Sequence, residues 1–103
     1  MVGVLLVSRD TAWALAVAGE SRPAGDAVHV VLLDSAAAAA RVTHPCAGAI
    51  RAALDAGAVV AVHDEAAQRR GMAAGELVEG VKTVDLDEVA DLVTDATGSV
   101  LWL

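Results

Sequence analysis

Continuous apolar runs alternate along this chain with alanine-rich stretches. The runs at residues 2–7, 27–33 and 58–62 are rich in valine and leucine, and they contain almost no polar residues. Such unbroken apolar character is typical of strands that are buried on both faces, as in a parallel sheet beneath crossover helices. Shorter apolar segments at 81–84 and 99–103 predict two further strands.

The stretches between these runs predict helices. A Thr43-His44-Pro45 sequence followed by a glycine at position 57 is typical of a helix start and end. The predicted helical segments are 11–19, 35–41, 43–57, 65–71 and 87–96. A repeated strand–helix order indicates an open sheet with helices on both sides. We therefore expect a flavodoxin-like three-layer α/β/α sandwich with about five, mostly parallel strands, in one domain over residues 1–103.

The charge and composition of the chain narrow its function. Fourteen acidic and seven basic residues give a net charge of −7, and the only aromatic residues are two tryptophans. Such a surface repels phosphate backbones and offers no platform for base stacking, so we expect no direct nucleic-acid binding. No apolar run approaches about 20 residues, the length that spans a membrane. Residues 2–7 lack a basic flank and a cleavage site, so we interpret them as a strand and expect a cytoplasmic protein.

The motifs indicate neither a metal nor a cofactor. Cys46 is the only cysteine, which excludes an intrachain disulfide and a cysteine-based metal cage. His29, His44 and His63 do not fall at the spacings of paired metal ligands. The glycines form no dinucleotide-binding or phosphate-loop pattern.

His63 ends the third apolar run, where ligands collect in parallel α/β sheets. Its imidazole could bind an anion or move a proton near neutral pH. The alternative is a polar strand-end residue that hydrogen-bonds to Asp64 or to the backbone. Asp64 is expected to cap the next helix. Arg69 and Arg70 either clamp an anion or form a solvated face at the helix end.

Cys46 is the second candidate for chemistry. If Thr43 or His44 caps the following helix, Cys46 lies in its first turn, where unpaired N–H groups and a protonated His44 would favour the thiolate. The alternative is a small buried apolar residue, which describes most free cysteines.

Several short motifs resemble the DsrE/DsrF/DsrH family of small sulfur-relay proteins. They include an apolar strand followed by a short alanine-rich helix and an Arg-Gly pair, and a Leu-Asp-Glu-Val-Ala-Asp-Leu segment that leads to a terminal strand. The residues that carry the resemblance are Ala56-Gly57-Ala58, Arg69-Arg70-Gly71, Gly80-Val81, 86–92 and the penultimate Trp102, which is similar to the DsrH (TusB-like) branch.

This resemblance implies a role in sulfur transfer. Relatives of this kind carry persulfide sulfur on a cysteine, and counting back from the Arg-Gly pair places that cysteine at His63. The resemblance therefore implies a structural or partner subunit of a sulfur relay, with tRNA thiolation as one pathway it could serve, and not a stand-alone enzyme. One alternative is a persulfide carrier that uses Cys46. Another is a small-anion or metabolite-binding module at the carboxyl edge of the sheet, using His63.

The segment at 11–18 (TAWALAVA) has almost no polar side. A helix of this composition is expected to be buried nearly all round. Because a chain of this size rarely covers a helix completely, we expect a subunit interface at Trp13. Together with the apolar Leu101-Trp102-Leu103 segment, where Trp102 is expected to serve packing, this predicts a homo-oligomer, or a hetero-oligomer with cysteine-bearing DsrE-like relatives.

Overall fold

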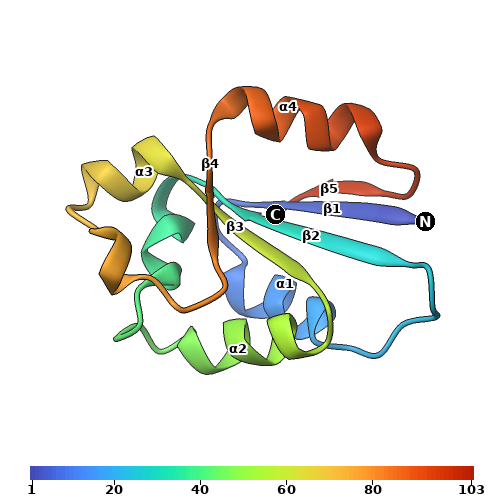
Figure 1. Ribbon diagram of the computed structural model, residues 1–103, viewed down its shortest axis with the longest axis horizontal. Helices are drawn as coiled ribbons and strands as arrows, with labels where there is room; N and C mark the ends of the chain where they lie inside the picture. Colours follow the sequence, from blue (N-terminus) through green and yellow to red (C-terminus); the bar gives the residue numbers. More distant parts are fainter.

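A computed structural model describes all residues 1–103 and contains one five-stranded sheet (Figure 1). All strand pairs are parallel, and the strand order is β4-β3-β2-β1-β5. The strands are β1 (Val2–Val7), β2 (Ala27–Leu32), β3 (Val59–His63), β4 (Lys82–Val84) and β5 (Val100–Trp102). The three continuous apolar runs form the three interior strands. The predicted flavodoxin-like three-layer α/β/α sandwich is therefore confirmed.

The helices alternate with the strands as the sequence predicts, although some boundaries differ. They are α1 (Thr11–Ala18), α2 (Ala47–Asp55), α3 (Asp64–Arg69) and α4 (Leu86–Asp95), with 3-10 segments η1 (Asp34–Ala40) and η2 (Ala74–Glu76). The expectation of one helix over 43–57 is too long at its start, because residues 43–46 form turns before α2. The alanine run forms a 3-10 segment between β2 and α2, and four of its alanines are buried.

The two faces of the sheet are covered unequally. Alternate side chains of the strands, such as Leu5 and Val7 of β1, join α1, α2 and α3 in a core of 21 buried residues. The other side chains, such as Val4 and Leu6, join α4 in a core of only seven. Three helices therefore cover one face of the sheet and a single helix covers the other. Figure 1 shows α4 across the sheet from α1 and α2.

The expectation that α1 is buried nearly all round is wrong for the chain by itself. Ala14, Leu15 and Ala18 face the sheet and are buried, whereas Trp13 is 53% exposed. One side of the helix reaches the core, and nothing in the same chain covers the other side. Trp102 was expected to serve packing, but it is 69% exposed on β5, where its indole nitrogen donates to the Ser8 hydroxyl oxygen at 3.3 Å.

None of the helices has the length and apolar character needed to cross a membrane.

Candidate functional site

At the carboxyl ends of β3 and β4, the chain leaves two neighbouring strands towards opposite faces of the sheet. The helices that follow β1, β2 and β3 pack on one face of the sheet, while α4, which follows β4, packs on the other. His63 is the last residue of β3 and lies in register with Val84, the last residue of β4. Crevices in open α/β sheets form where the helices after neighbouring strands diverge in this way. The topology therefore places His63 at the position where ligands bind in this class of fold.

The side chain of His63 is buried, with 8% of the residue exposed. Its Nε2 lies 3.6 Å from Asp64 Oδ1, just beyond hydrogen-bond distance. Asp64 was expected to cap α3, but that expectation is wrong. β3 extends one residue further than predicted, so His63 occupies the cap position and Asp64 is the first helical residue. The Asp64 carboxylate accepts only from the backbone N–H of Glu65, at 2.6 Å.

The turns that follow the carboxyl ends of the strands contain more acidic than basic residues. Asp10, Asp34, Asp64 and Asp85 follow β1 to β4, and Arg9 is the one basic residue among these turns. Asp34 also has a positive φ of 48°, which is uncommon for a residue with a side chain. The sequence analysis did not predict that backbone conformation. A carboxylate-rich edge does not favour an anion beside His63.

Cys46 lies immediately before α2, at its cap position, and not in its first turn as expected. Its thiol makes no capping hydrogen bond, and the side chain is partly buried against the three-helix core. The backbone N–H of Cys46 donates to His44 Nδ1 at 3.0 Å. A ring nitrogen that accepts this bond carries no proton. His44 therefore stabilises the turn before α2, and a cationic His44 beside the thiol would require this bond to break.

The structure does not join the two candidate residues in one pocket. β3 ends and α2 begins on the same side of the sheet (Figure 1), and η1 packs against α2, α3 and β3. Neither Cys46 nor His63 lines any of the three main surface hollows. Cys46 and His63 are therefore two separate candidates and not parts of one cavity.

The two arginines at the end of α3 are engaged within the chain. Arg69 pairs with Glu65 one helical turn earlier, at 3.3 Å. Arg70 donates to the backbone carbonyl of Ala66 at 3.0 Å. The backbone carbonyl of Arg70 in turn accepts from Arg41, whose guanidinium also pairs with Glu76. These contacts favour a structural role for the pair over an anion clamp.

A hollow of about 290 Å³ lies between α4 and the sheet, and the sequence pattern did not reveal it. His29 and Lys82 lie on its strand side, and Glu88, Asp91 and Asp95 lie on its helix side. Burial, and to a smaller extent the Lys82 ammonium, lower the pKa of His29 below its ordinary value of 6.5. The hollow exists because a single helix covers this face. The hollow depends on how β2, β3, β4 and α4 pack together, which no local motif in the sequence indicates.

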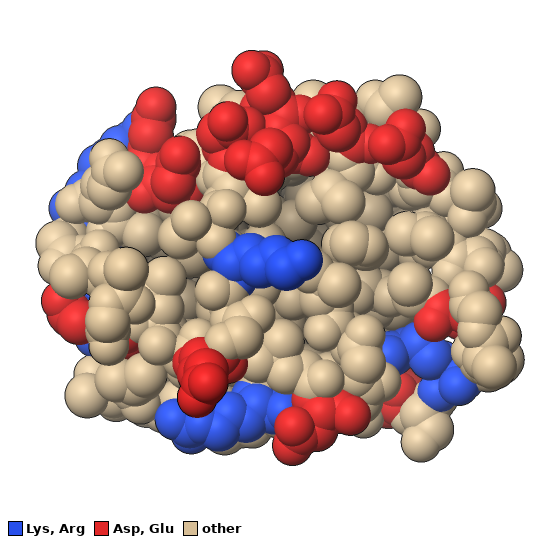
Figure 2. Space-filling model, viewed as in Figure 1, with Lys and Arg blue, Asp and Glu red and all other residues tan.

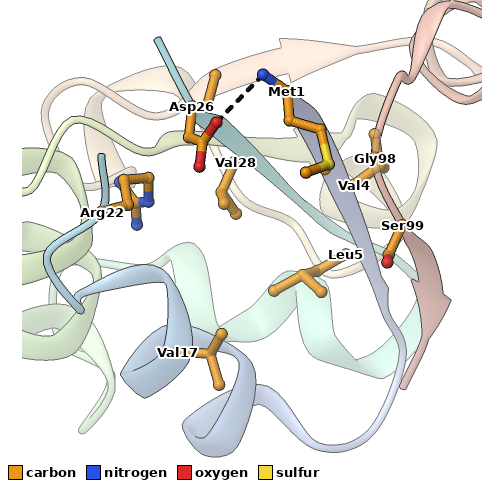
Figure 3. A pocket seen from close by; sticks show the side chains of 11 residues that line it. Met1, Val4, Leu5, Val17, Arg22, Asp26, Val28, Gly98 and Ser99 are labelled. Atoms are coloured by element: carbon orange, nitrogen blue, oxygen red, sulfur yellow. Dashed lines mark hydrogen bonds and ion pairs between the residues drawn. The ribbon is translucent and has the colours of Figure 1, made fainter. Parts of the chain in front are cut away.

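A second hollow of about 260 Å³ lies at the amino ends of β1 and β2, whereas His63 lies at the carboxyl end of β3. Figure 3 shows the side chains that line this hollow. Met1, Val17 and Val28 give it an apolar lining. Its charged groups are already paired within the chain. The amino group of Met1 lies 3.2 Å from Asp26, and Arg22 donates to the backbone carbonyl of Ala56 at 3.0 Å.

No three histidine, cysteine, aspartate or glutamate side chains come together in a way that could hold a metal ion.

Solved structures of other proteins are similar to this chain in fold. No protein-family model and no curated protein sequence matches the chain. The crystal structure of the ychN protein from E. coli is similar over 100% of both chains, with a TM-score of 0.80 and 18% identity. MTH1491 from Methanobacterium thermoautotrophicum, a protein of unknown function, is similar over 99% of this chain and 97% of its own, with a TM-score of 0.78 and 15% identity. YchN has a DsrE/DsrF-like fold, so these likenesses confirm the fold that the sequence resemblance implies.

Proposed function

We propose that this protein is a structural or partner subunit of a sulfur-relay system and does not itself carry the sulfur. The observation that carries this proposal is the buried His63 at the carboxyl end of β3. In the family that the chain resembles, the sulfur-carrying cysteine stands at this point, and an imidazole cannot form a persulfide. The one thiol of the chain, Cys46, lies elsewhere and packs against the core.

Uncovered apolar surface supports the part of the proposal that concerns assembly. Trp13 on α1 is 53% exposed, and Leu101 and Trp102 on β5 are 44% and 69% exposed. Large apolar side chains that stay exposed in one chain often mark an interface. The proposed partners are further copies of this chain or cysteine-bearing relatives of the same fold, in the cytoplasm. tRNA thiolation is one pathway in which such a subunit would act through its partners.

The sulfur chemistry is tested by persulfide labelling. The protein is incubated with inorganic polysulfide at neutral pH, and intact-mass spectrometry counts the added sulfur atoms. Polysulfide is the sulfur donor, and the shortened polysulfide is the leaving group. We expect the wild-type protein to gain sulfur slowly, because the Cys46 thiol makes no capping hydrogen bond that would activate it. A His63→Cys/Cys46→Ser variant should gain sulfur faster than the wild type, if the end of β3 activates a thiol.

The same assay separates the proposal from its main alternative, a persulfide carrier that uses Cys46. Its supporting observation is that this thiol is partly exposed at the start of the nine-residue helix α2. Rapid persulfidation or alkylation of wild-type Cys46 at neutral pH would overturn the structural-subunit proposal in favour of this carrier. Equal or slower labelling at position 63 would count against the alignment of His63 with the sulfur-carrier position.

Assembly is tested separately by multi-angle light scattering. We expect the wild-type protein to exceed the mass of one chain at micromolar concentration. Trp13→Asp should reduce that mass, while its circular dichroism spectrum stays that of a folded protein. Val42→Asp, which changes a residue of similar exposure (41%) in a turn, is the matched control. A wild-type mass equal to one chain would remove the interface argument.

A further inference from the structure

The outer edge of β5 is an apolar strand edge that nothing in the chain covers. β5 is the last strand of the sheet beside β1, and its three residues Val100, Leu101 and Trp102 are all exposed. Natural sheets usually protect such edges with charged side chains, prolines or bulges. β5 contains none of these. The edge is therefore open to pairing with another strand.

The backbone of β5 shows which groups are free to pair. The carbonyl of Ser99 accepts from Val4 at 2.9 Å, and the N–H of Leu103 donates to Leu6 at 2.7 Å, so both residues point their backbone groups towards β1. Backbone groups alternate in direction along a strand. Val100 and Trp102 therefore direct their N–H and C=O groups towards the free edge.

We propose that the β5 edge pairs with β5 of a second copy of this chain, in an antiparallel arrangement centred on Leu101. A two-fold axis makes the two strands antiparallel. Centring the pair on Leu101 places Val100 of each copy opposite Trp102 of the other. Those are the residues with free backbone groups, and each such pair exchanges both hydrogen bonds. The edge is thus complementary to itself without any change in the chain.

The side chains favour the same register. Val100 and Trp102 lie in register with Val4 and Leu6 of β1, so they face the α4 side of the sheet. Across the proposed interface, Trp102 of one copy lies beside Val100 of the other. Cross-strand pairs of an aromatic and a β-branched residue stabilise antiparallel sheets.

The charge distribution makes this edge the place where repulsion between two copies is smallest. The chain has a net charge of −7, and Figure 2 shows acidic side chains gathered over α4. β5 has no charged residue, so two like-charged copies can approach there. Val89 of α4 packs among residues of β1 to β4, so both β5 strands would lie between the two acidic helices. The opposite edge, β4, carries Lys82 and is followed directly by Asp85.

The proposal deepens the assembly part of the proposed function and does not depend on the sulfur chemistry. Its test is crosslinking of Leu101→Cys in a Cys46→Ser background. At the two-fold axis the two Leu101 residues form a pair without hydrogen bonds, whose Cα atoms lie about 4.5 Å apart. That separation allows a disulfide. We expect mild oxidation to convert most of this variant to a covalent dimer whose circular dichroism matches the wild type. Val93→Cys, on α4 and similarly exposed, is the matched control and should stay monomeric on a non-reducing gel.

Hydrogen exchange of the wild-type protein provides a readout without any mutation. The N–H groups of Val100 and Trp102 should exchange at least tenfold more slowly at high protein concentration than after dilution to the monomer. Exchange rates that do not change with concentration would overturn the proposal, as would a Leu101→Cys variant that does not crosslink while the wild type is dimeric. A monomeric wild type would overturn it as well. None of these outcomes bears on persulfide labelling, so failure here is distinct from failure of the sulfur-relay role.

Discussion

The two faces of the sheet use the same strands but differ in how completely they are closed. On the face of α1, α2 and α3, 21 buried residues form one continuous core. On the face of α4 the buried cluster has seven residues, and a hollow lined by His29 and Lys82 remains beside the helix. The first face therefore supplies most of the hydrophobic stabilisation, because that term scales with the apolar area removed from water.

This difference follows from the strand order. The chain moves from β1 to β2, β3 and β4 in one direction, and right-handed crossovers then place all three connecting helices on one face. Only the return from β4 to β5 crosses the other face, so only α4 covers it. The smaller core on the α4 face is therefore a consequence of topology and not of a weak apolar pattern in the strands.

Truncation of a core residue on the three-helix face should cause the largest loss of stability. Ile50 on α2 has no exposed surface. We expect Ile50→Ala to reduce the free energy of unfolding by about 2–5 kcal/mol, because it leaves a cavity in a closed core. Val89→Ala, which truncates the one α4 residue buried in the smaller core, should reduce it clearly less. Urea denaturation measures both, and equal losses would contradict the unequal division of the core.

The caps of α4 and α1 should differ in their contribution to stability, by less than the core residues do. The Asp85 carboxylate accepts a hydrogen bond from the backbone N–H of Glu88 at 2.8 Å. The Glu88 carboxylate in turn accepts one from the backbone N–H of Asp85 at 3.2 Å. We expect Asp85→Ala to cost about 0.5–2 kcal/mol of stability. Asp10 stands at the same position before α1 but makes no side-chain capping bond. Asp10→Ala should therefore cost clearly less in the same thermal or urea unfolding experiment, and an equal cost would show that charge, not the cap, matters.

A still smaller effect on stability should come from pH, through His29 in the hollow beside α4. Burial, and then Lys82, lower the pKa of His29 in the folded chain below 6.5. The unfolded chain therefore binds the proton more readily. The contribution of His29 to stability is complete above about pH 6.5 and falls as the pH drops below that value. His29→Gln should lose less stability than the wild type between about pH 7.5 and 5.5.

Urea unfolding at both pH values measures this difference. Lys82→Gln is the companion variant, and it should weaken the pH dependence only in part, because burial is the larger cause. An unchanged pH dependence in His29→Gln would show that His29 does not titrate differently in the folded chain.

The sequence alone predicted the strands well because burial on both faces leaves an unambiguous pattern. Residues 2–7, 27–33 and 58–62 contain almost no polar residues, and each of these runs covers all or most of an interior strand. The same uniformity made α1 hard to interpret. Its residues are apolar on all sides, so the pattern could not indicate that Leu15 faces the core while Trp13 faces outwards.

The site was less predictable than the fold. Position in the chain placed His63 at a strand end, but whether β3 stops at Val62 or includes His63 decides which residue caps α3. A local sequence pattern does not locate a helix boundary to within one residue. The hydrogen bond from Cys46 to His44 depends on a turn geometry, and the hollow at His29 depends on packing between distant segments.

The pairing of β5 with β1 has a consequence for how the molecule folds. Val4 lies beside Val100, so this contact joins segments separated by almost the whole chain, whereas β1, β2 and β3 follow one another through much shorter connections. Contacts that close long loops form late, because the entropy of closure must be overcome first. A folding intermediate with β1 to β3 in place would then present the apolar edge of β1 to solvent. Until β5 pairs with β1, we expect that edge to be open to pairing with other chains and thus to aggregation.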